Sequence, residues 1–107
     1  MTTAVLRPLA EADLIARTRH VRTHGGNAVA ERFFDAAIAA LVAIEKMPRA
    51  GSPRLGELCG IPGLRTRRVI GVSCCWYYLV AGKHVDVVRL LDDAQDLPTI
   101  LADLTGD

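Results

Sequence analysis

The sequence predicts an α+β domain with the element order β-α-α-β-β-β, in which a helical hairpin packs on a mainly antiparallel sheet. Two segments with apolar residues at helical spacing, 10–24 and 27–47, are separated by only two glycines. Three segments rich in β-branched and aromatic residues then follow between residues 64 and 91. A chain of 107 residues has room for one domain, which we assign to residues 1–107.

The first half of the chain predicts a short strand and then the hairpin. Residues 4–7 are mostly apolar and precede Pro8, which stops a strand and is tolerated at the start of a helix. Gly25 and Gly26 end the first helix, because glycine takes a left-handed cap without steric cost. The side chain of Asn27 is expected to cap the second helix. That helix carries a wide apolar stripe made of Ala30, Phe33, Phe34, Ala37, Ile38, Leu41 and Ile44.

The second half of the chain predicts a loop and three strands. Residues 48–63 read PRAGSPRLGELCGIPG, and their prolines and glycines predict an extended loop without a regular element. Strands are expected at 64–72, 74–81 and 84–91, and a short helix at 96–104. Both faces of the middle strand are apolar, so it is expected at the centre of the sheet. The alternation of a strand places four residues on one face of the last one, namely Val85, Val87, Arg89 and Leu91.

Composition and charge narrow the range of possible functions. No segment reaches the ~20 apolar residues of a membrane span, and no signal peptide is visible, so a cytoplasmic protein without a membrane contact is expected. Three cysteines are an odd number, and buried free thiols are the simplest account. Residues 1–68 hold eleven Arg or Lys and six Asp or Glu, whereas residues 69–107 hold two and six. This balance does not fit a strongly basic nucleic-acid binder, and it suits a protein partner.

A series of short motifs runs through the chain in a fixed order. They are A-x-x-D-L at 10–14, G-x-x-x-A-x-R-F at 26–33, M-P-x-x-G at 47–51, G-L-R-x-R-x-V at 63–69, Y-Y-x-V at 77–80 and V-D-V-V-R-L-L at 85–91. Together they resemble the RelE/ParE superfamily of type II toxin–antitoxin toxins, and the ParE branch more closely. The resemblance spans about residues 4–97.

The resemblance implies a small toxin that needs no cofactor. A cognate, ParD-like antitoxin would neutralise it in a hetero-oligomer, and operator DNA would be contacted only through that antitoxin. The ParE branch implies inhibition of DNA gyrase by protein–protein binding. The RelE branch implies ribosome-dependent cleavage of messenger RNA, and a third alternative is a non-toxic module of an autorepressor complex.

The residues favour binding over catalysis. An RNA-cleaving toxin needs a base, an acid and cations around the scissile phosphate. The candidates for those roles are Arg65, Tyr78, His84 and Arg89. The superfamily's last strand is usually followed by a histidine and basic residues, whereas this chain has Asp92, Asp93 and Asp96 there. Carboxylates oppose RNA binding, so we expect no catalytic residue.

Partner contacts are expected on the arginine-rich strand and beside it. An edge strand flanked by arginines invites strand addition by an extended peptide. An apolar groove between the helical hairpin and the sheet is expected to receive the antitoxin. Arg89, among apolar neighbours, needs an ionic partner, for which Asp13 and Asp92 are candidates. The predicted partner-binding residues are Arg49, Arg54, Arg65, Arg67, Arg68, Trp76, Tyr78 and Arg89.

A metal site is not expected. His20 and His24 lie four residues apart on one helix, which is the spacing of a two-histidine site. The segment HVRTH lacks the glutamate of a metalloprotease motif, and no third ligand is evident. A solvated cationic face is the favoured interpretation.

Overall fold

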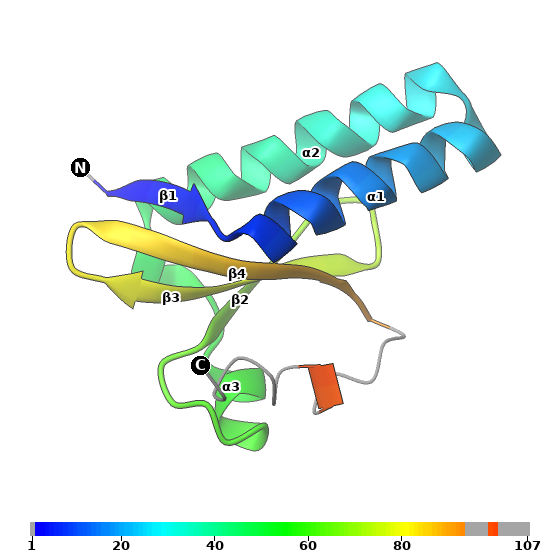
Figure 1. The fold of residues 1–107 in the computed structure, drawn as a ribbon. Helices are drawn as coiled ribbons and strands as arrows, with labels where there is room; N and C mark the ends of the chain where they lie inside the picture. The colour runs from blue at the N-terminus through cyan, green and yellow to red at the C-terminus, as the bar shows by residue number, and fades with distance from the viewer. Residues whose placement is uncertain (1, 94–98, 101–107) are drawn as a thin grey trace.

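The computed structural model describes residues 2–93 and 99–100. Its four strands form one mixed sheet in the order β1-β4-β3-β2, and two long helices lie together on one side of it (Figure 1). The elements are β1 (Thr3–Leu6), α1 (Pro8–Gly25), α2 (Asn27–Lys46), η1 (Pro48–Ala50), α3 (Arg54–Leu58), β2 (Arg65–Arg68), β3 (Cys74–Ala81) and β4 (His84–Asp92). This arrangement confirms the predicted α+β class. Of the helix predicted at 96–104, all but 99 and 100 lies outside the described residues.

The sheet is mainly antiparallel, as predicted. β3 pairs in antiparallel fashion with β2 and with β4, and β1 adds to β4 as a short parallel edge. The turn between β3 and β4 includes Gly82, whose φ of 64° lies in the left-handed region that favours glycine. Among the described residues, no helix is both long and apolar enough to cross a membrane.

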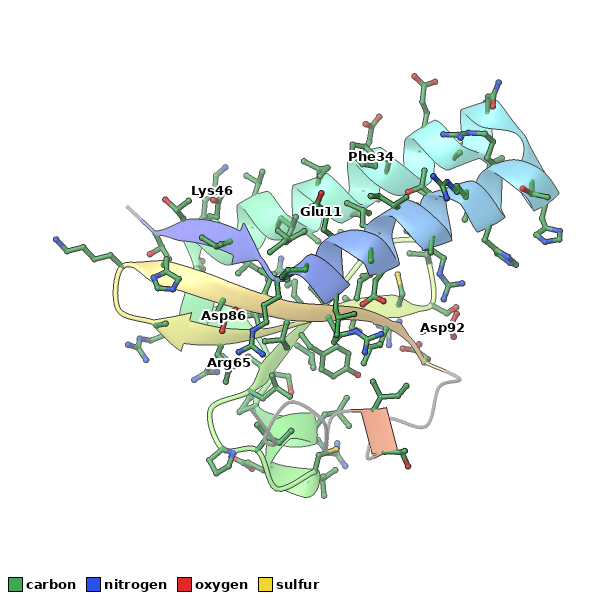
Figure 2. All side chains as sticks on the ribbon, viewed as in Figure 1. Glu11, Phe34, Lys46, Arg65, Asp86 and Asp92 are labelled. Carbon is green, nitrogen blue, oxygen red and sulfur yellow. The ribbon has the colours of Figure 1, made fainter. Side chains whose placement is uncertain are left out.

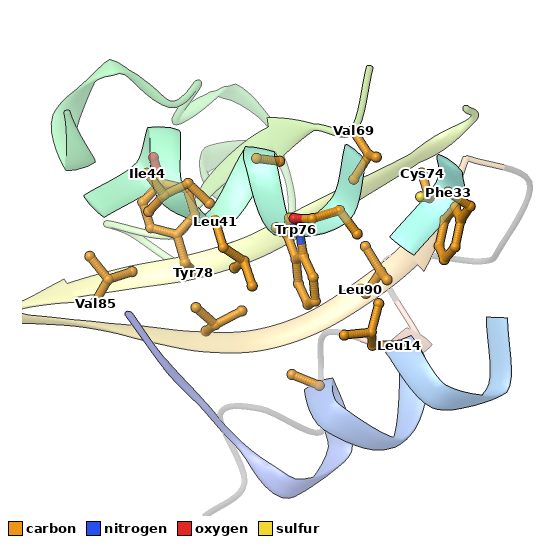
Figure 3. Close-up of a cluster of buried hydrophobic side chains, with 14 residues drawn as sticks. Leu14, Phe33, Leu41, Ile44, Val69, Cys74, Trp76, Tyr78, Val85 and Leu90 are labelled. Carbon is orange, nitrogen blue, oxygen red and sulfur yellow. Dashed lines mark hydrogen bonds between the residues drawn. The ribbon is translucent and has the colours of Figure 1, made fainter. Parts of the chain in front are cut away.

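The main core lies between the helical hairpin and the sheet (Figure 3). Trp76 and Tyr78 of β3 are fully buried there, against Phe33 and Ile44 of α2. The indole Nε1 of Trp76 donates a hydrogen bond to the carbonyl of Ala37 at 3.0 Å, so the polar atom of this large side chain is satisfied. The chain's own side chains fill most of the space between the hairpin and the sheet, so the groove that we expected there is confined to hollows beside this core.

A second core covers the opposite face of the sheet. Cys75 and Tyr77 of β3 and Leu91 of β4 are buried there, under Ile61 and Leu64 from the segment around α3. β3 is thus covered on both faces, as its sequence predicted. All three cysteines are free, and Cys74 and Cys75 are buried on opposite faces of the strand.

Two details of the helical segments differ from the prediction. The side chain of Asn27 makes no capping hydrogen bond; α2 begins instead with the carbonyl of Gly26 accepting from the amide of Ala30. The segment 48–63 is also not wholly irregular, since it contains η1 and the short helix α3. Gly56 of α3 packs so closely that a Cβ atom there would lie 2.4 Å from the carbonyl oxygen of Leu64. Such tertiary packing holds a helix whose sequence alone would not form one.

Two strands also differ from the prediction. The strand expected at 64–72 spans only Arg65–Arg68, because the chain turns at Gly71, where φ is 87°. In β4, Tyr78 pairs with Val87 and Tyr77 pairs with Arg89, which leaves Val88 as the extra residue of a β-bulge. The bulge changes the alternation, so Val85 and Val87 face the hairpin core whereas Leu91 joins the opposite core. Arg89 and Leu91 follow the bulge and pair with residues of the other face, Tyr77 and Cys75, so the prediction that Val85, Val87, Arg89 and Leu91 share one face was wrong.

Candidate functional site

The arginines of β2 divide between the two faces of the sheet. Arg65 pairs with Tyr78 and Arg67 pairs with Trp76, so both arginines belong to the helix side, whereas Arg68 pairs with Cys75 on the other side. The guanidinium of Arg65 donates to the carbonyls of Arg49 at 3.1 Å and Gly51 at 2.7 Å. Arg65 therefore fastens the segment after α2 to the sheet; Figure 2 labels its side chain.

Several arginines carry charge that the fold does not neutralise. Arg49 and Arg54 are exposed and Arg67 is partly buried. In the part of the chain that the structure describes, neither these three arginines nor Arg65 pairs with a carboxylate. Guanidinium groups without a carboxylate partner attract acidic or other anionic partners.

The acidic residues at the end of β4 form ion pairs with arginines of α1 and β2. Asp92 accepts from Arg17 of α1 at 2.5 Å, and Asp93 accepts from Arg68 at 2.9 Å. The hydrogen bond from Arg68 to Asp93 raises the pKa of that guanidinium further above its ordinary value. Two of the three carboxylates that distinguish this chain from the usual basic end of the superfamily are therefore engaged in ion pairs.

A small groove lies between α2 and β2. Its volume is about 90 Å³, and alanines of α2 form its floor, whereas Arg67, Arg68 and Ile70 form its rim. Ile70 is 85% exposed, the highest value among the large apolar residues that the structure describes. The floor residues are Ala36, Ala39, Ala40 and Ala43.

The outer edge of β2 is only partly open. Ser52 exchanges two backbone hydrogen bonds with Thr66, at 3.1 and 3.0 Å, and so occupies the edge there. Successive residues of a strand direct their backbone N–H and C=O groups to opposite sides. After Thr66, the next residue of β2 whose backbone groups face the outer edge is therefore Arg68. Strand addition along all of β2, as the sequence suggested, would have to displace Ser52. The edge at Arg68, beside the groove, needs no such displacement.

Trp76 and Tyr78 are not available to a partner in this fold. Both side chains are fully buried. The phenol of Tyr78 donates to the carbonyl of Pro48 at 2.8 Å, and burial raises the pKa of Tyr78 above its ordinary value. Gly51 permits this arrangement, because a Cβ atom there would lie 2.0 Å from the phenol oxygen. The prediction that Trp76 and Tyr78 contact a partner was wrong, because both belong to the core under α2.

The four candidate residues for RNA cleavage do not form one site. His84 and Arg89 lie five residues apart on β4, which is about 16 Å along a strand. The guanidinium of Arg89 binds the carboxylate of Asp13 of α1 at 2.7 Å. Asp13, one of the two candidate ionic partners, is thus a partner of Arg89. A buried phenol with a raised pKa is also poorly matched to proton transfer at neutral pH.

The two histidines of α1 lie close together, with ring centroids 4.3 Å apart. In residues 2–93 and 99–100, no group of three or more His, Cys, Asp or Glu side chains is placed to hold a metal ion. A pair of histidines on an exposed helix fits the solvated cationic face expected from the sequence.

Sequence reasoning predicted an apolar groove between the hairpin and the sheet, but it did not place that groove between α2 and the edge strand β2. The signal available was Ile70, an apolar residue in a turn that follows three arginines. The alanines of α2 were not predicted to form the floor of a groove. Their role became visible only once α2 was placed beside β2.

Comparison with known proteins identifies the family. A hairpin of two helices on a sheet of order β1-β4-β3-β2 is a RelE/ParE-like fold, and the chain resembles a solved structure of the chromosomal ParDE toxin–antitoxin system from P. aeruginosa. That match has a TM-score of 0.73 and 22% identity, and it covers 86% of this chain and 96% of the other. Residues 4–97 match the family model of the ParE toxin of the type II toxin–antitoxin system parDE. The chain belongs to this ParE toxin family. Among curated proteins, none matches its sequence.

Proposed function

We propose that this chain acts by binding DNA gyrase and inhibiting it, without catalysing a reaction itself. Support comes from the state of the side chains that an RNase would need. The phenol of Tyr78 donates a hydrogen bond to a backbone carbonyl, Arg65 is bound to two carbonyls, and Arg89 is held by a carboxylate. Positive charge remains on Arg49, Arg54 and Arg67, and this charge suits contact with another macromolecule.

We further propose that a ParD-like antitoxin neutralises the toxin through the groove between α2 and β2. An acidic, extended segment fits the chemistry of this groove. Its carboxylates would pair with Arg67, a small apolar side chain would enter above the alanines, and its backbone would bond to the open edge at Arg68. The product is a hetero-oligomer in the cytoplasm, and operator DNA contacts only the antitoxin.

Expression of the chain alone in bacterial cells tests the mode of action. Growth, the DNA-damage response and the integrity of messenger RNA are followed after induction. The proposal predicts growth arrest with DNA breaks while messenger RNA stays intact. Early cleavage of messenger RNA would instead indicate a ribosome-dependent endoribonuclease, and normal growth would indicate a non-toxic module of an autorepressor complex.

A further inference from the structure

Two arginine-rich segments meet at one edge of the sheet. Residues 48–56 and 60–69 together hold five arginines and no Asp or Glu. The bridge between Ser52 and Thr66 joins the two segments, and its two backbone hydrogen bonds hold the first segment against the edge strand β2 (Figure 1). Within the described residues, four of the five arginines pair with no carboxylate, and the exception is Arg68. We call these four the bridge arginines, namely Arg49, Arg54, Arg65 and Arg67.

The structure brings the bridge arginines close to one another. The guanidinium of Arg65 donates through Nη1 to the carbonyls of Arg49 and Gly51, and its Nε and Nη2 make no hydrogen bond with the described residues. Arg65 and Arg67 lie on the same side of β2, with their Cα atoms about 7 Å apart. Burial raises the pKa of the Tyr78 phenol, and both of these arginines lie near enough to oppose that rise. Their positive charges are therefore concentrated beside the segment that carries Arg49.

The acids nearest to the bridge arginines along the chain are Glu45 and Glu57. Glu45 accepts from the amide of Ala4 at 2.8 Å, and Ala4 belongs to β1 at the opposite edge of the sheet. Glu57 is exposed on α3 and makes no ion pair within the described residues. The overall charge of +1 thus hides a local excess of positive charge, which attracts an anionic partner.

We propose that the bridge arginines bind phosphate groups of double-stranded DNA, without reading its sequence. Guanidinium groups bind phosphates through two parallel hydrogen bonds, and cations that repeat along a strand can meet successive phosphates. The setting of this inference rests on the proposed function, because the duplex is the DNA that gyrase holds while the toxin blocks it. The DNA then supplies part of the surface to which the toxin binds.

The aromatic residues favour a duplex over a single strand. Proteins bind single-stranded nucleic acid largely by stacking its bases on aromatic side chains. Four of the five Phe, Trp and Tyr residues are buried, namely Phe33, Trp76, Tyr77 and Tyr78. Phe34, the fifth, lies on the side of α2 away from the sheet (Figure 2). The bridge arginines therefore have no aromatic neighbour to stack on bases, and phosphates of a duplex need none.

The antitoxin and the duplex compete for Arg67. This arginine lies on the rim of the groove proposed for the antitoxin. An acidic segment bound there places carboxylates beside the bridge arginines, and like charges keep the phosphates away. Operator DNA therefore contacts only the antitoxin in the hetero-oligomer, whereas the free toxin binds DNA itself.

Fluorescence anisotropy of the full chain with a labelled DNA duplex, without gyrase or antitoxin, tests the proposal. Binding should weaken as salt rises from about 50 to about 200 mM, with a slope of about −3 in a plot of log K against log salt, because three or four phosphates are contacted. Two duplexes of unrelated sequence should bind alike. Absence of binding, or tighter binding of a single strand of the same length, would overturn the proposal.

A pair of double variants locates the binding surface. Arg49→Ala with Arg67→Ala removes two bridge arginines, and it should weaken duplex binding by about tenfold or more and bring the slope about two closer to zero. Arg19→Ala with Arg22→Ala removes the same charge from exposed positions of α1 and should change both quantities much less. Circular dichroism verifies that both variants are folded. Equal effects would show a diffuse attraction to the whole chain and would overturn the proposal.

Two further measurements separate this inference from the proposed function. A poly-glutamate peptide is added as a competitor, and a peptide that binds more tightly than the duplex would assign the bridge arginines to an acidic protein instead. Gyrase supercoiling is assayed with the same variants, and the loss of Arg49 and Arg67 should weaken inhibition more than the loss of Arg19 and Arg22. A chain that inhibits gyrase without binding the duplex would overturn this inference alone. A chain that binds the duplex and leaves gyrase unaffected would overturn the proposed function alone.

Discussion

Asp13 of α1 binds two groups of β4 at once. Its carboxylate accepts from the guanidinium of Arg89 at 2.7 and 3.0 Å and from the backbone amide of Leu90 at 3.0 Å. β1 pairs with β4 only as far as Val87, so beyond that residue the edge of β4 lies against α1. Asp13 thus replaces a neighbouring strand for the amide of Leu90 and joins the helical hairpin to the sheet.

Removal of this carboxylate should destabilise the fold. We expect Asp13→Ala to lower the free energy of unfolding by about 2–4 kcal/mol, because a partly buried guanidinium and a strand amide both lose this carboxylate as an acceptor. Urea denaturation measures the change. Asp93→Ala is the matched control, since its ion pair with Arg68 is exposed and should contribute little to stability. Equal losses in the two variants would contradict the role given to Asp13.

Gly51 should not tolerate a side chain. Its Cβ would lie 2.0 Å from the phenol oxygen of Tyr78 and 2.9 Å from the carbonyl of Thr66, so we expect Gly51→Ala to cost about 2–3 kcal/mol in urea denaturation. Adding Tyr78→Phe removes the phenol oxygen and should restore part of the loss. Gly25→Ala, whose Cβ would meet only the side chain of Val29 at 3.2 Å, is the control and should change stability less. A neutral Gly51→Ala would show that the close approach to Tyr78 is not rigid.

Stability should fall in alkaline solution. Burial raises the pKa of Cys74 from 9.0 to about 11 and that of Tyr77 from 10.0 to about 12. The folded state therefore holds these two protons more tightly than the unfolded state does, and the resulting stabilisation is complete below pH 9 and lost as the pH rises towards 12. Urea midpoints measured between pH 8 and pH 11 should decrease. Cys74→Ala should flatten that decrease, and an equally steep decrease in this variant would contradict the contribution of Cys74.

The sequence predicted the elements better than their junctions. Apolar periodicity located both long helices, and the two apolar faces of residues 74–81 correctly placed that strand at the centre of the sheet. The bulge at Val88 was not predictable, because it depends on how β4 pairs with β3 and has no marker residue. α3 was missed because Gly56 disfavours a helix until its packing against the Leu64 carbonyl is known.

The sequence predicted the charged residues of the candidate site, but not the shape of the site. The arginines of β2 were evident from the sequence, and four of the predicted arginines (Arg49, Arg54, Arg65 and Arg67) pair with no carboxylate within the described residues. Trp76 was misplaced because alternation within a strand shows which residues share a face, not that the chain itself covers both faces of β3. The helix that covers Trp76 is α2, whose alanine surface also forms the floor of the groove.

Reversal of the charge at Arg67 should weaken the antitoxin complex. Arg67 lies on the rim of the groove between α2 and β2 and has no carboxylate partner within the described residues. We expect Arg67→Glu to weaken binding of the cognate antitoxin by about tenfold or more, because a negative charge then faces an acidic segment. Isothermal titration calorimetry measures the affinity. Arg19→Glu, the same change at an exposed position of α1, should have little effect, and equal effects of the two would assign the antitoxin to another surface.

Assay of purified DNA gyrase with the purified chain tests the central claim most directly. Supercoiling activity and DNA cleavage are measured together, and messenger RNA on ribosomes is incubated in parallel. The account predicts that the chain inhibits supercoiling, that the antitoxin reverses the inhibition, and that the RNA stays whole. Unchanged gyrase activity together with cleaved RNA would contradict it.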